Sequence, residues 1–450
     1  MQHYLQKIDE GSDLNAFIFV LEESARRHAQ EIDQKVKQGK AGKLAGAIIA
    51  VKDLIAMREQ PLTCGSRILD QFISPYDATV VAKLQREDAI IVGKTNLDEF
   101  GMGSSNENSS FGPVKNPHDS ARVAGGSSGG SCAAVAATMA IAALGTDTGG
   151  SIRQPAAFCG VVGLKPTYGR VSRYGLAAFA SSCDQIGPIT RCVDDAALLL
   201  QVMSGQDPND ATSASQPVPD FSRGSMEGVS GLRIGLPREY FEEEAAADVV
   251  AALQELVARL RQEGAQVVDV SLPHTDHAVA VYYLISTAEA SSNLARYDGA
   301  RYGFRADDVQ SLEEMYVESR SQGFGDEVKR RIMLGTYVLS AGYQDAYYRK
   351  AQQVRTLIRR DFENAFDRCD CLLTPTTPTT AFKLGEKTQD PLAMYLSDIY
   401  TAPVNLAGLP AISVPCGTDS EALPIGAQVI GKRFDEEMIL RVGRWIERVS

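Results

Sequence analysis

The sequence predicts an α/β fold, in which strands and helices alternate along the chain. Runs rich in β-branched residues at 47–51 and 89–92 are typical of buried strands, and a segment with helical spacing, 78–85, lies between them. Hydrophobic residues make up 44% of the chain and charged residues 23%, which is typical of a soluble globular enzyme. A chain of 450 residues can bury a large core.

Two helices are expected in the first third of the chain. Residues 14–39 carry apolar side chains at helical spacing with charges on the other face, which predicts an amphipathic helix. The alanine-rich run 132–144 directly follows a glycine cluster and predicts a fully buried helix. The N-terminus of that helix should point its free N–H groups at the loop 125–131.

The second half of the chain repeats the alternation. Strands are expected at 232–236 and 266–270, on either side of an amphipathic helix at 245–262. Two later apolar runs, 371–373 and 411–414, are expected to return to the main sheet as strands.

Two segments differ from this pattern. Residues 205–231 are polar and predict a surface connection or lid, and residues 278–367 are expected to be a mainly helical excursion. The sequence shows no internal repeat, so the simplest account is one domain over residues 1–450.

The net charge and the cysteine content argue against some kinds of binding site. The formal net charge of −12 argues against this chain holding nucleic acid over a broad face without a partner. The eight cysteines include no CxxC pair, and we expect reduced thiols and no metal site. Neither a signal peptide nor a run long enough to span a bilayer is evident, so a cytoplasmic protein without membrane contact is expected.

Three features predict a hydrolase that uses serine and lysine. Glycine–serine clusters lie at 125–131 and 146–151, and Lys52 ends an apolar strand upstream. Glycines let the backbone turn sharply and bring N–H groups close to an oxyanion. Serine needs a base, and burial would lower the pKa of Lys52 towards that of a neutral amine. Taken alone, a glycine–serine cluster is as often a plain loop as part of a catalytic site, and such a lysine as often extends to the surface as stays buried.

Two other kinds of site fit less well. A phosphate-binding loop at Gly93-Lys94-Thr95 would require a glycine where Asp88 stands. A serine–histidine–aspartate triad needs a histidine held by an acid, but the five histidines are expected at solvated or turn positions. They are His3, His28, His118, His274 and His277.

The clusters together resemble the amidase signature family. The resemblance lies in Gly-Gly-Ser-Ser-Gly-Gly-Ser at 125–131, Gly-Thr-Asp-Thr-Gly-Gly-Ser-Ile-Arg-Gln-Pro-Ala at 145–156 and Val-Lys-Asp at 51–53. It implies a single α/β domain in which helices cover a mixed twisted sheet, with the active site at the glycine-rich loops.

The resemblance also implies the catalytic residues. Ser151 would be the nucleophile, Ser127 a proton relay held in a cis peptide bond, and Lys52 the base. Backbone N–H groups would stabilise the oxyanion; they belong to Thr148, Gly149, Gly150 and Ser151 itself.

Later motifs narrow the resemblance to the glutaminase subunits of bacterial tRNA-dependent amidotransferases. These motifs lie at 101–108, 296–303, 328–331 and 403–410. The chain departs from such subunits at its two ends, which are shorter. For glutamine as substrate, the resemblance implies that Arg331 binds the α-carboxylate, Asp398 binds the α-ammonium and Tyr282 lines the pocket.

The resemblance further implies a heterotrimer with the B and C subunits of the amidotransferase. This chain would carry no cofactor or metal, whereas one of its partners would use ATP and magnesium and would bind most of the mischarged tRNA. The acceptor could be Glu-tRNA(Gln), Asp-tRNA(Asn) or both. Two alternatives stay open: a free-standing amidase acting on another carboxamide, and a silent binding protein, against which the intact serines and lysine argue.

Overall fold

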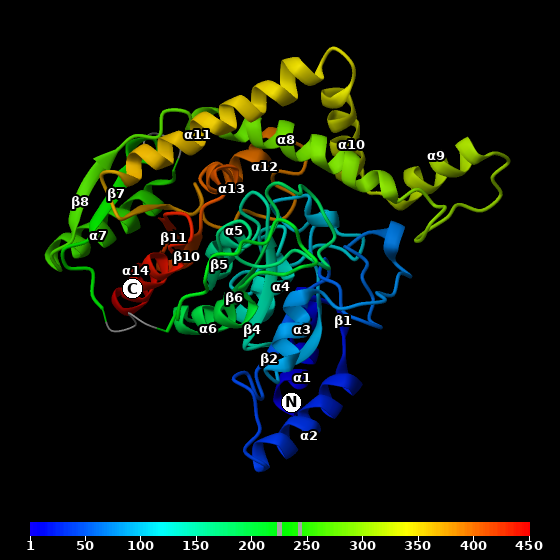
Figure 1. Ribbon diagram of the computed structural model, residues 1–450, viewed down its shortest axis with the longest axis horizontal. Helices are drawn as coiled ribbons and strands as arrows, with labels where there is room; N and C mark the ends of the chain where they lie inside the picture. Colours follow the sequence, from blue (N-terminus) through cyan, green and yellow to red (C-terminus); the bar gives the residue numbers. More distant parts are fainter. Residues whose placement is uncertain (223–226, 242–244) are drawn as a thin grey trace.

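The protein is built on one twisted sheet covered by helices (Figure 1). The computed structural model describes residues 1–222, 227–241 and 245–450. The strand order is β1-β3-β2-β4-β6-β5-β10-β11-β9-β7-β8. The strands are β1 (Phe17–Val20), β2 (Ile48–Lys52), β3 (Ile90–Thr95), β4 (Ala142–Asp147), β5 (Val162–Lys165), β6 (Gln185–Thr190), β7 (Arg233–Pro237), β8 (Gln266–Val270), β9 (Cys371–Pro375), β10 (Ala411–Thr418) and β11 (Pro424–Gly431).

The sheet mixes parallel and antiparallel pairs. Strand β2 is parallel to both β3 and β4, whereas β4 runs antiparallel to β6. Further along, β10 is antiparallel to β5 and β11, and β7 is parallel to β8 and β9. The predicted fold class, a mixed sheet covered by helices, is confirmed.

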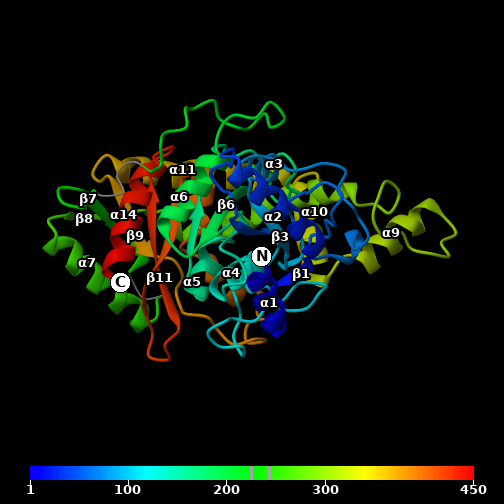
Figure 2. The same cartoon turned by 90° about the horizontal axis from the view of Figure 1, so that it is seen from below.

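Helices cover both faces of the sheet. On one face α14, α6 and α3 follow one another, each in contact with the next (Figure 2). A band of α8, α10 and α11 runs along one side of the molecule, and α9 extends from its end (Figure 1). The helices are α1 (Gln2–Glu10), α2 (Glu22–Lys37), α3 (Thr79–Arg86), α4 (Gly129–Ala136), α5 (Arg153–Cys159), α6 (Val193–Met203), α7 (Ala247–Gln262), α8 (Ala278–Asn293), α9 (Leu312–Gly323), α10 (Asp326–Leu339), α11 (Lys350–Phe366), α12 (Pro391–Tyr395), α13 (Ala402–Ala407) and α14 (Glu436–Val449).

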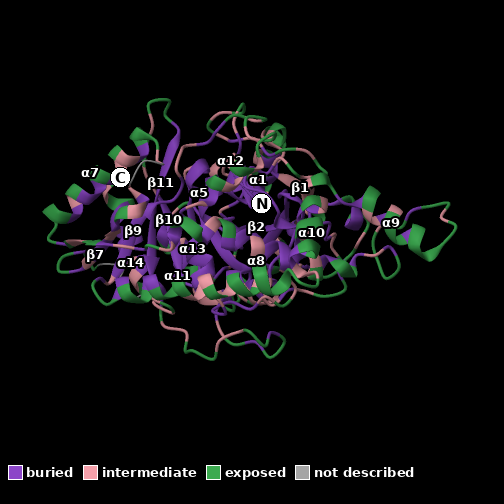
Figure 3. Cartoon of the chain, turned by 90° about the horizontal axis from the view of Figure 1, so that it is seen from above, coloured by how far each residue is buried: buried purple, intermediate pink, exposed green. Residues whose placement is uncertain are grey.

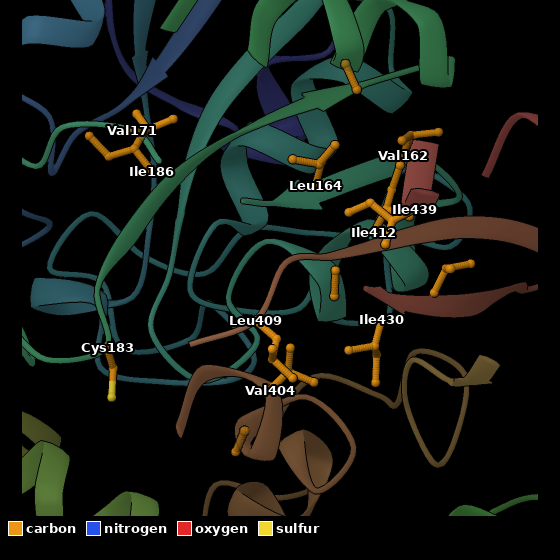
Figure 4. Packing of buried hydrophobic residues seen from close by; sticks show 14 of the residues in the cluster. Val162, Leu164, Val171, Cys183, Ile186, Val404, Leu409, Ile412, Ile430 and Ile439 are labelled. Carbon is orange, nitrogen blue, oxygen red and sulfur yellow. The ribbon is translucent and has the colours of Figure 1, made fainter. Parts of the chain in front are cut away.

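The central strands are buried on both faces (Figure 3). Because successive side chains of a strand point to opposite faces, Ile48 and Ala50 join the core beneath α4, and Ile49 and Val51 join the larger core on the other face. In the larger core, strands β5 and β10 meet α14 through apolar side chains (Figure 4). Burial on both faces places the end of β2 in the protein interior.

Two helix predictions are wrong in part. Within the expected helix 14–39, residues 17–20 form strand β1, which pairs with β3, and α2 begins only at Glu22. Within the expected helix 132–144, α4 ends at Ala136 and strand β4 begins at Ala142. A continuous apolar run fits a buried strand as well as a buried helix, so only pairing with a neighbouring strand decides between them.

The strand predictions in the second half are confirmed within a few residues, and the helix α7 is confirmed too. The polar stretch 205–222 contains neither helix nor strand, while its continuation at 223–226 lies outside the described residues. Residues 278–367 are mainly helical. None of the helices in the described ranges has the length and apolar content of a membrane-spanning segment.

Close packing of α10 on α8 predicts the effect of one substitution. A Cβ atom at Gly335 would lie 1.9 Å from the Thr287 carbonyl oxygen, so Gly335→Ala must push the two helices apart. We expect a loss of about 1–3 kcal/mol in the free energy of unfolding, measured with urea, because overpacking destabilises a core. Thr336→Ala, at an exposed position of the same helix, is the control. Equal stabilities of the two variants would contradict this packing.

Candidate active site

Lys52 lies at the carboxyl end of β2 and is fully buried. Its Nζ lies 2.8 Å from Ser127 Oγ, 2.9 Å from Ser128 Oγ and 2.8 Å from Thr146 Oγ1. A neutral amine has two N–H donors and one lone pair, so one of these three hydroxyls can donate its proton to Nζ. The arrangement therefore allows Lys52 to accept a proton from a serine.

The protein interior favours the neutral form of Lys52. Burial lowers the pKa of Lys52 from 10.5 to about 7, although the negative charges of Asp98 and Asp147 oppose the shift. A base whose pKa lies near the working pH transfers protons most efficiently. Lys52 is therefore suited to general-base chemistry at neutral pH.

Ser127 lies in a tightly packed loop before α4. The Gly126–Ser127 peptide bond is cis, as the family resemblance implies, and Gly125 has φ +84°. A Cβ atom at Gly126 would lie 2.0 Å from Asp98 Oδ2, so glycine is required for the loop to approach this carboxylate. The approach brings Ser127 Oγ to Lys52.

Ser151 follows a turn that only glycines permit. Gly150 has φ +141°, and a Cβ atom there would lie 2.1 Å from Thr401 Oγ1. A Cβ atom at Gly149 would lie 2.5 Å from Cζ of Tyr282. Thr401 Oγ1 donates to the Gly149 carbonyl oxygen at 2.7 Å, and this bond fixes the turn. Such a turn can direct backbone N–H groups towards an oxyanion.

A hydrogen bond joins the two glycine-rich loops: the Ser128 N–H donates to the Ser151 carbonyl oxygen at 3.1 Å. The turn at 148–151 is also tied to a carboxylate, because Thr148 Oγ1 donates to Asp184 Oδ1 at 2.8 Å. Burial raises the pKa of Asp184 to about 6, although the Thr148 bond opposes the shift. The structure thus brings Lys52, Ser127 and the 148–151 turn into one buried assembly.

A buried ion pair holds the turn at 148–151 in place. Arg153 Nη2 lies 3.0 Å from Asp147 Oδ1, and both side chains are fully buried. Asp147 Oδ2 also accepts the backbone N–H of Ile152 at 3.2 Å. Burial alone would raise the pKa of Asp147, but the Arg153 charge outweighs it and the pKa falls to about 2. The pair therefore stays ionised and holds both ends of the turn.

The three residues expected to bind substrate come from distant segments. Tyr282 belongs to α8, Arg331 to α10, and Asp398 ends a short 3₁₀ helix, Leu396–Asp398. All three are buried. The Tyr282 ring lies beside Gly149, where it leaves no room for a side chain. Asp398 Oδ1 lies beside Gly150, 3.2 Å from where a Cβ atom of that residue would be. The structure therefore brings Tyr282 and Asp398 to the turn that precedes Ser151.

Arg331 is held by one carboxylate and three aromatic rings. Its Nε donates to Glu327 Oε1 at 2.7 Å. Its guanidinium lies over three rings at 5.1–5.6 Å from their centroids, those of Phe179, Tyr283 and Tyr395. Glu327 also lines a polar cavity of about 680 Å³ between the segments 107–110 and 321–329.

Asp398 retains a free acceptor. Its Oδ2 accepts a hydrogen bond from Ser104 Oγ at 2.5 Å, while none of the described residues hydrogen-bonds to its Oδ1. Burial raises the pKa of Asp398 to about 7, although the Ser104 bond opposes the shift. A cation at Oδ1 would favour the ionised carboxylate.

The sequence patterns missed several polar residues of this assembly. Ser128 and Thr146 stand in the glycine–serine clusters, so their position was a usable signal. Ser104 and Gln154 stand in the motifs at 101–108 and 145–156, but neither motif indicated their partners, and Asp98 lies outside the motifs. Only the fold brings these three residues beside the loops. In residues 1–222, 227–241 and 245–450 there is no group of three or more His, Cys, Asp or Glu side chains placed to hold a metal ion.

The chain belongs to the amidase signature family. The Amidase family model matches residues 1–440. The fold and the buried serine–lysine assembly described above therefore belong to an amidase signature enzyme.

Several relatives that share one name match nearly the whole length of this chain. The chain is 55% identical to the A subunit of glutamyl-tRNA(Gln) amidotransferase from Salinibacter ruber, covering 98% of this chain and 94% of that protein. Identity to the protein of that name in Geotalea daltonii is 59%, over 97% and 90% of the two chains. A solved structure of the protein of that name from Thermotoga maritima is 47% identical, with a TM-score of 0.80 over 95% and 92% of the two chains.

The depressed pKa of Lys52 predicts a pH-dependent stability. Between pH 7 and 10.5 the unfolded chain binds more protons than the folded protein, so the penalty of burying this amine falls as the pH rises. The stability of Lys52→Met relative to the wild type should therefore decrease from pH 7 to pH 10, by about 2 kcal/mol or more. Urea unfolding at several pH values measures this difference.

The exposed Lys37→Met variant controls for the loss of a lysine. A difference between Lys52→Met and the wild type that stayed constant from pH 7 to pH 10 would contradict the lowered pKa of Lys52.

Proposed function

We propose that this chain is the glutaminase subunit of a tRNA-dependent amidotransferase. One observation carries the proposal: a fully buried lysine amine lies 2.8 Å from Ser127 Oγ, beside the turn that leads to Ser151. The chain is also 55–59% identical to proteins named as the A subunit of glutamyl-tRNA(Gln) amidotransferase. That name gives glutamyl-tRNA(Gln) as the acceptor in those proteins, and glutamine is the amide donor that we propose for this chain.

The first half of the reaction forms a tetrahedral intermediate. Neutral Lys52 accepts the Ser127 proton while Ser127 accepts the Ser151 proton, and Ser151 Oγ attacks the side-chain amide carbon of glutamine. The negative charge that develops on the amide oxygen is stabilised by backbone N–H groups of the turn. Loss of one such donor is worth about 3 kcal/mol. The donors are those of Thr148, Gly149, Gly150 and Ser151.

The second half releases two products. The proton held by Lys52 returns through Ser127 to the amide nitrogen, so the C–N bond breaks and ammonia leaves. A γ-glutamyl ester then remains on Ser151 Oγ. Water attacks the ester carbon and gives up its proton along the same path, which frees glutamate and restores the Ser151 hydroxyl.

Three side chains distinguish glutamine from other amides. The Arg331 guanidinium binds the α-carboxylate, and the free Oδ1 of Asp398 binds the α-ammonium. Tyr282 lines the pocket beside Gly149. A pocket that binds both charged α-groups would bind simple carboxamides less tightly than glutamine, because its own charged groups would then stay unpaired.

The acceptor half of the reaction belongs to partner proteins. The relatives are named as one subunit of an amidotransferase, which implies a multi-subunit complex, and we propose a cytoplasmic heterotrimer with the B and C subunits. A partner would use ATP and magnesium to activate the acidic side chain on mischarged tRNA, either Glu-tRNA(Gln) or Asp-tRNA(Asn). The net charge of −12 agrees with tRNA being held mainly by the partners.

The role of Ser151 is tested by covalent labelling. A glutamine analogue with an electrophilic carbon in place of the amide should form an adduct on Ser151, located by peptide mass spectrometry. Lys52→Arg should prevent labelling, because arginine stays protonated at the working pH. Ser131→Ala, which changes another serine of the 125–131 cluster, should still be labelled. An adduct on Ser127 or on a cysteine would show that the nucleophile is a different residue.

Reconstitution tests the function as a whole. The isolated chain should hydrolyse glutamine slowly, and partner subunits with ATP and mischarged tRNA should raise the rate and yield amidated tRNA. The assay measures glutamate, ammonia and the aminoacyl group on the tRNA. Full turnover without partners, with no amidated tRNA in the complete mixture, would instead support a free-standing amidase.

A further inference from the structure

Gln154 connects three loops of the active site with one side chain and one backbone group. Its Oε1 accepts the Gly126 N–H at 3.0 Å, and its Nε2 donates to the Ser104 carbonyl oxygen at 2.7 Å. Its own backbone N–H donates to the Gly150 carbonyl oxygen at 2.8 Å. The side chain is fully buried, so water does not compete for these bonds. Gln154 therefore links the loops that carry Ser127 and Ser151 to a third loop.

The third loop leads to the free carboxylate oxygen. Ser104, whose carbonyl oxygen accepts from Gln154, donates its hydroxyl proton to Asp398 Oδ2 at 2.5 Å. The other oxygen, Asp398 Oδ1, has no hydrogen-bond partner in the described part of the chain. A continuous path of hydrogen bonds thus runs from Asp398 through Ser104 and Gln154 to the amide of Gly126.

We propose that Gln154 is a positioning residue that couples the capture of a cationic substrate group at Asp398 to the placement of Ser127. The inference rests on the proposed function, because it takes the α-ammonium of glutamine as that group. When the ammonium binds Oδ1, it fixes the Asp398 carboxylate and with it Ser104. Through Gln154, the same event fixes Gly126 and hence the adjoining serine that contacts Lys52.

An apolar residue could fill the same volume without making this connection. It would leave the Gly126 N–H and the Ser104 carbonyl oxygen unpaired in a buried site. If Gln154 only supported the packing of the loops, its replacement would slow the reaction of every substrate equally. A coupling role acts most on a substrate that carries the cation, and this difference can be measured.

The test is a double-mutant cycle in the full chain assembled with its partner subunits. Ser104→Ala removes the hydroxyl that contacts Asp398, Gln154→Met removes the amide at nearly constant volume, and the third variant combines both changes. For each variant, kcat and KM are measured with glutamine and with butyramide, which lacks the α-groups. Gln352→Met, on α11, is the matched control for a glutamine-to-methionine change.

Each single variant should reduce the preference for glutamine over butyramide about tenfold, a loss of the size expected for one hydrogen bond, because either change interrupts the path from Asp398 to Gly126. The double variant should also lose about tenfold, because both changes break one path. Gln352→Met should keep the wild-type preference. For Ser104→Ala, the loss should lie mainly in KM for glutamine.

Two results would overturn the coupling: equal losses on both substrates, or a hundredfold loss of preference in the double variant. Failure of the proposed function is a separate result. In that case the wild-type assembly would hydrolyse butyramide but not glutamine, before any variant is compared.

Discussion

The burial of a lysine amine among hydroxyl groups is the constraint on which the rest of the site depends. Strand β2 is covered on both faces, so its last residue, Lys52, has no route to solvent. An amine in that position must stay largely neutral or find partners, and three hydroxyls supply them at 2.8–2.9 Å. Two of these hydroxyls belong to the 125–131 cluster, whose glycines allow the backbone to come this close. The contacts of Lys52 with Ser127 and Ser128 thus follow from one packing requirement.

A second layer of buried polar groups holds the turn that precedes Ser151. The Asp147–Arg153 pair would be costly to bury if either partner were alone, but each charge is matched and hydrogen-bonded. The pair lies at the end of β4 and the start of α5, so it fixes the chain on both sides of the Gly149–Gly150 turn. The two groups of buried residues therefore differ in their properties. Lys52 and the hydroxyls around it can exchange protons, whereas Asp147 and Arg153 stay charged and hold the backbone in place.

The residues proposed to bind substrate lie in a different part of the chain. They belong to α8, to α10 and to the segment after α12, far along the sequence from the glycine clusters. Tyr282 and Asp398 lie beside the Gly149–Gly150 turn, whereas Arg331 is held by Glu327 and by three aromatic rings.

The α/β class, most strands and the glycine-rich loops could be predicted from the sequence, because β-branched runs and glycine clusters are local signals. The sequence also pointed to Lys52, since an apolar run before a lysine predicts burial. It could not separate strand β4 from helix α4 within one alanine-rich run, because both are buried and apolar. Local patterns would have left Arg331 and Asp398 on the surface, and only the family resemblance drew attention to them. Tertiary structure alone decided that these two are buried and that Asp98, Ser104 and Gln154 lie beside the loops. Those contacts join residues far apart in the chain, and no local pattern encodes which distant polar group will be the partner of a buried one.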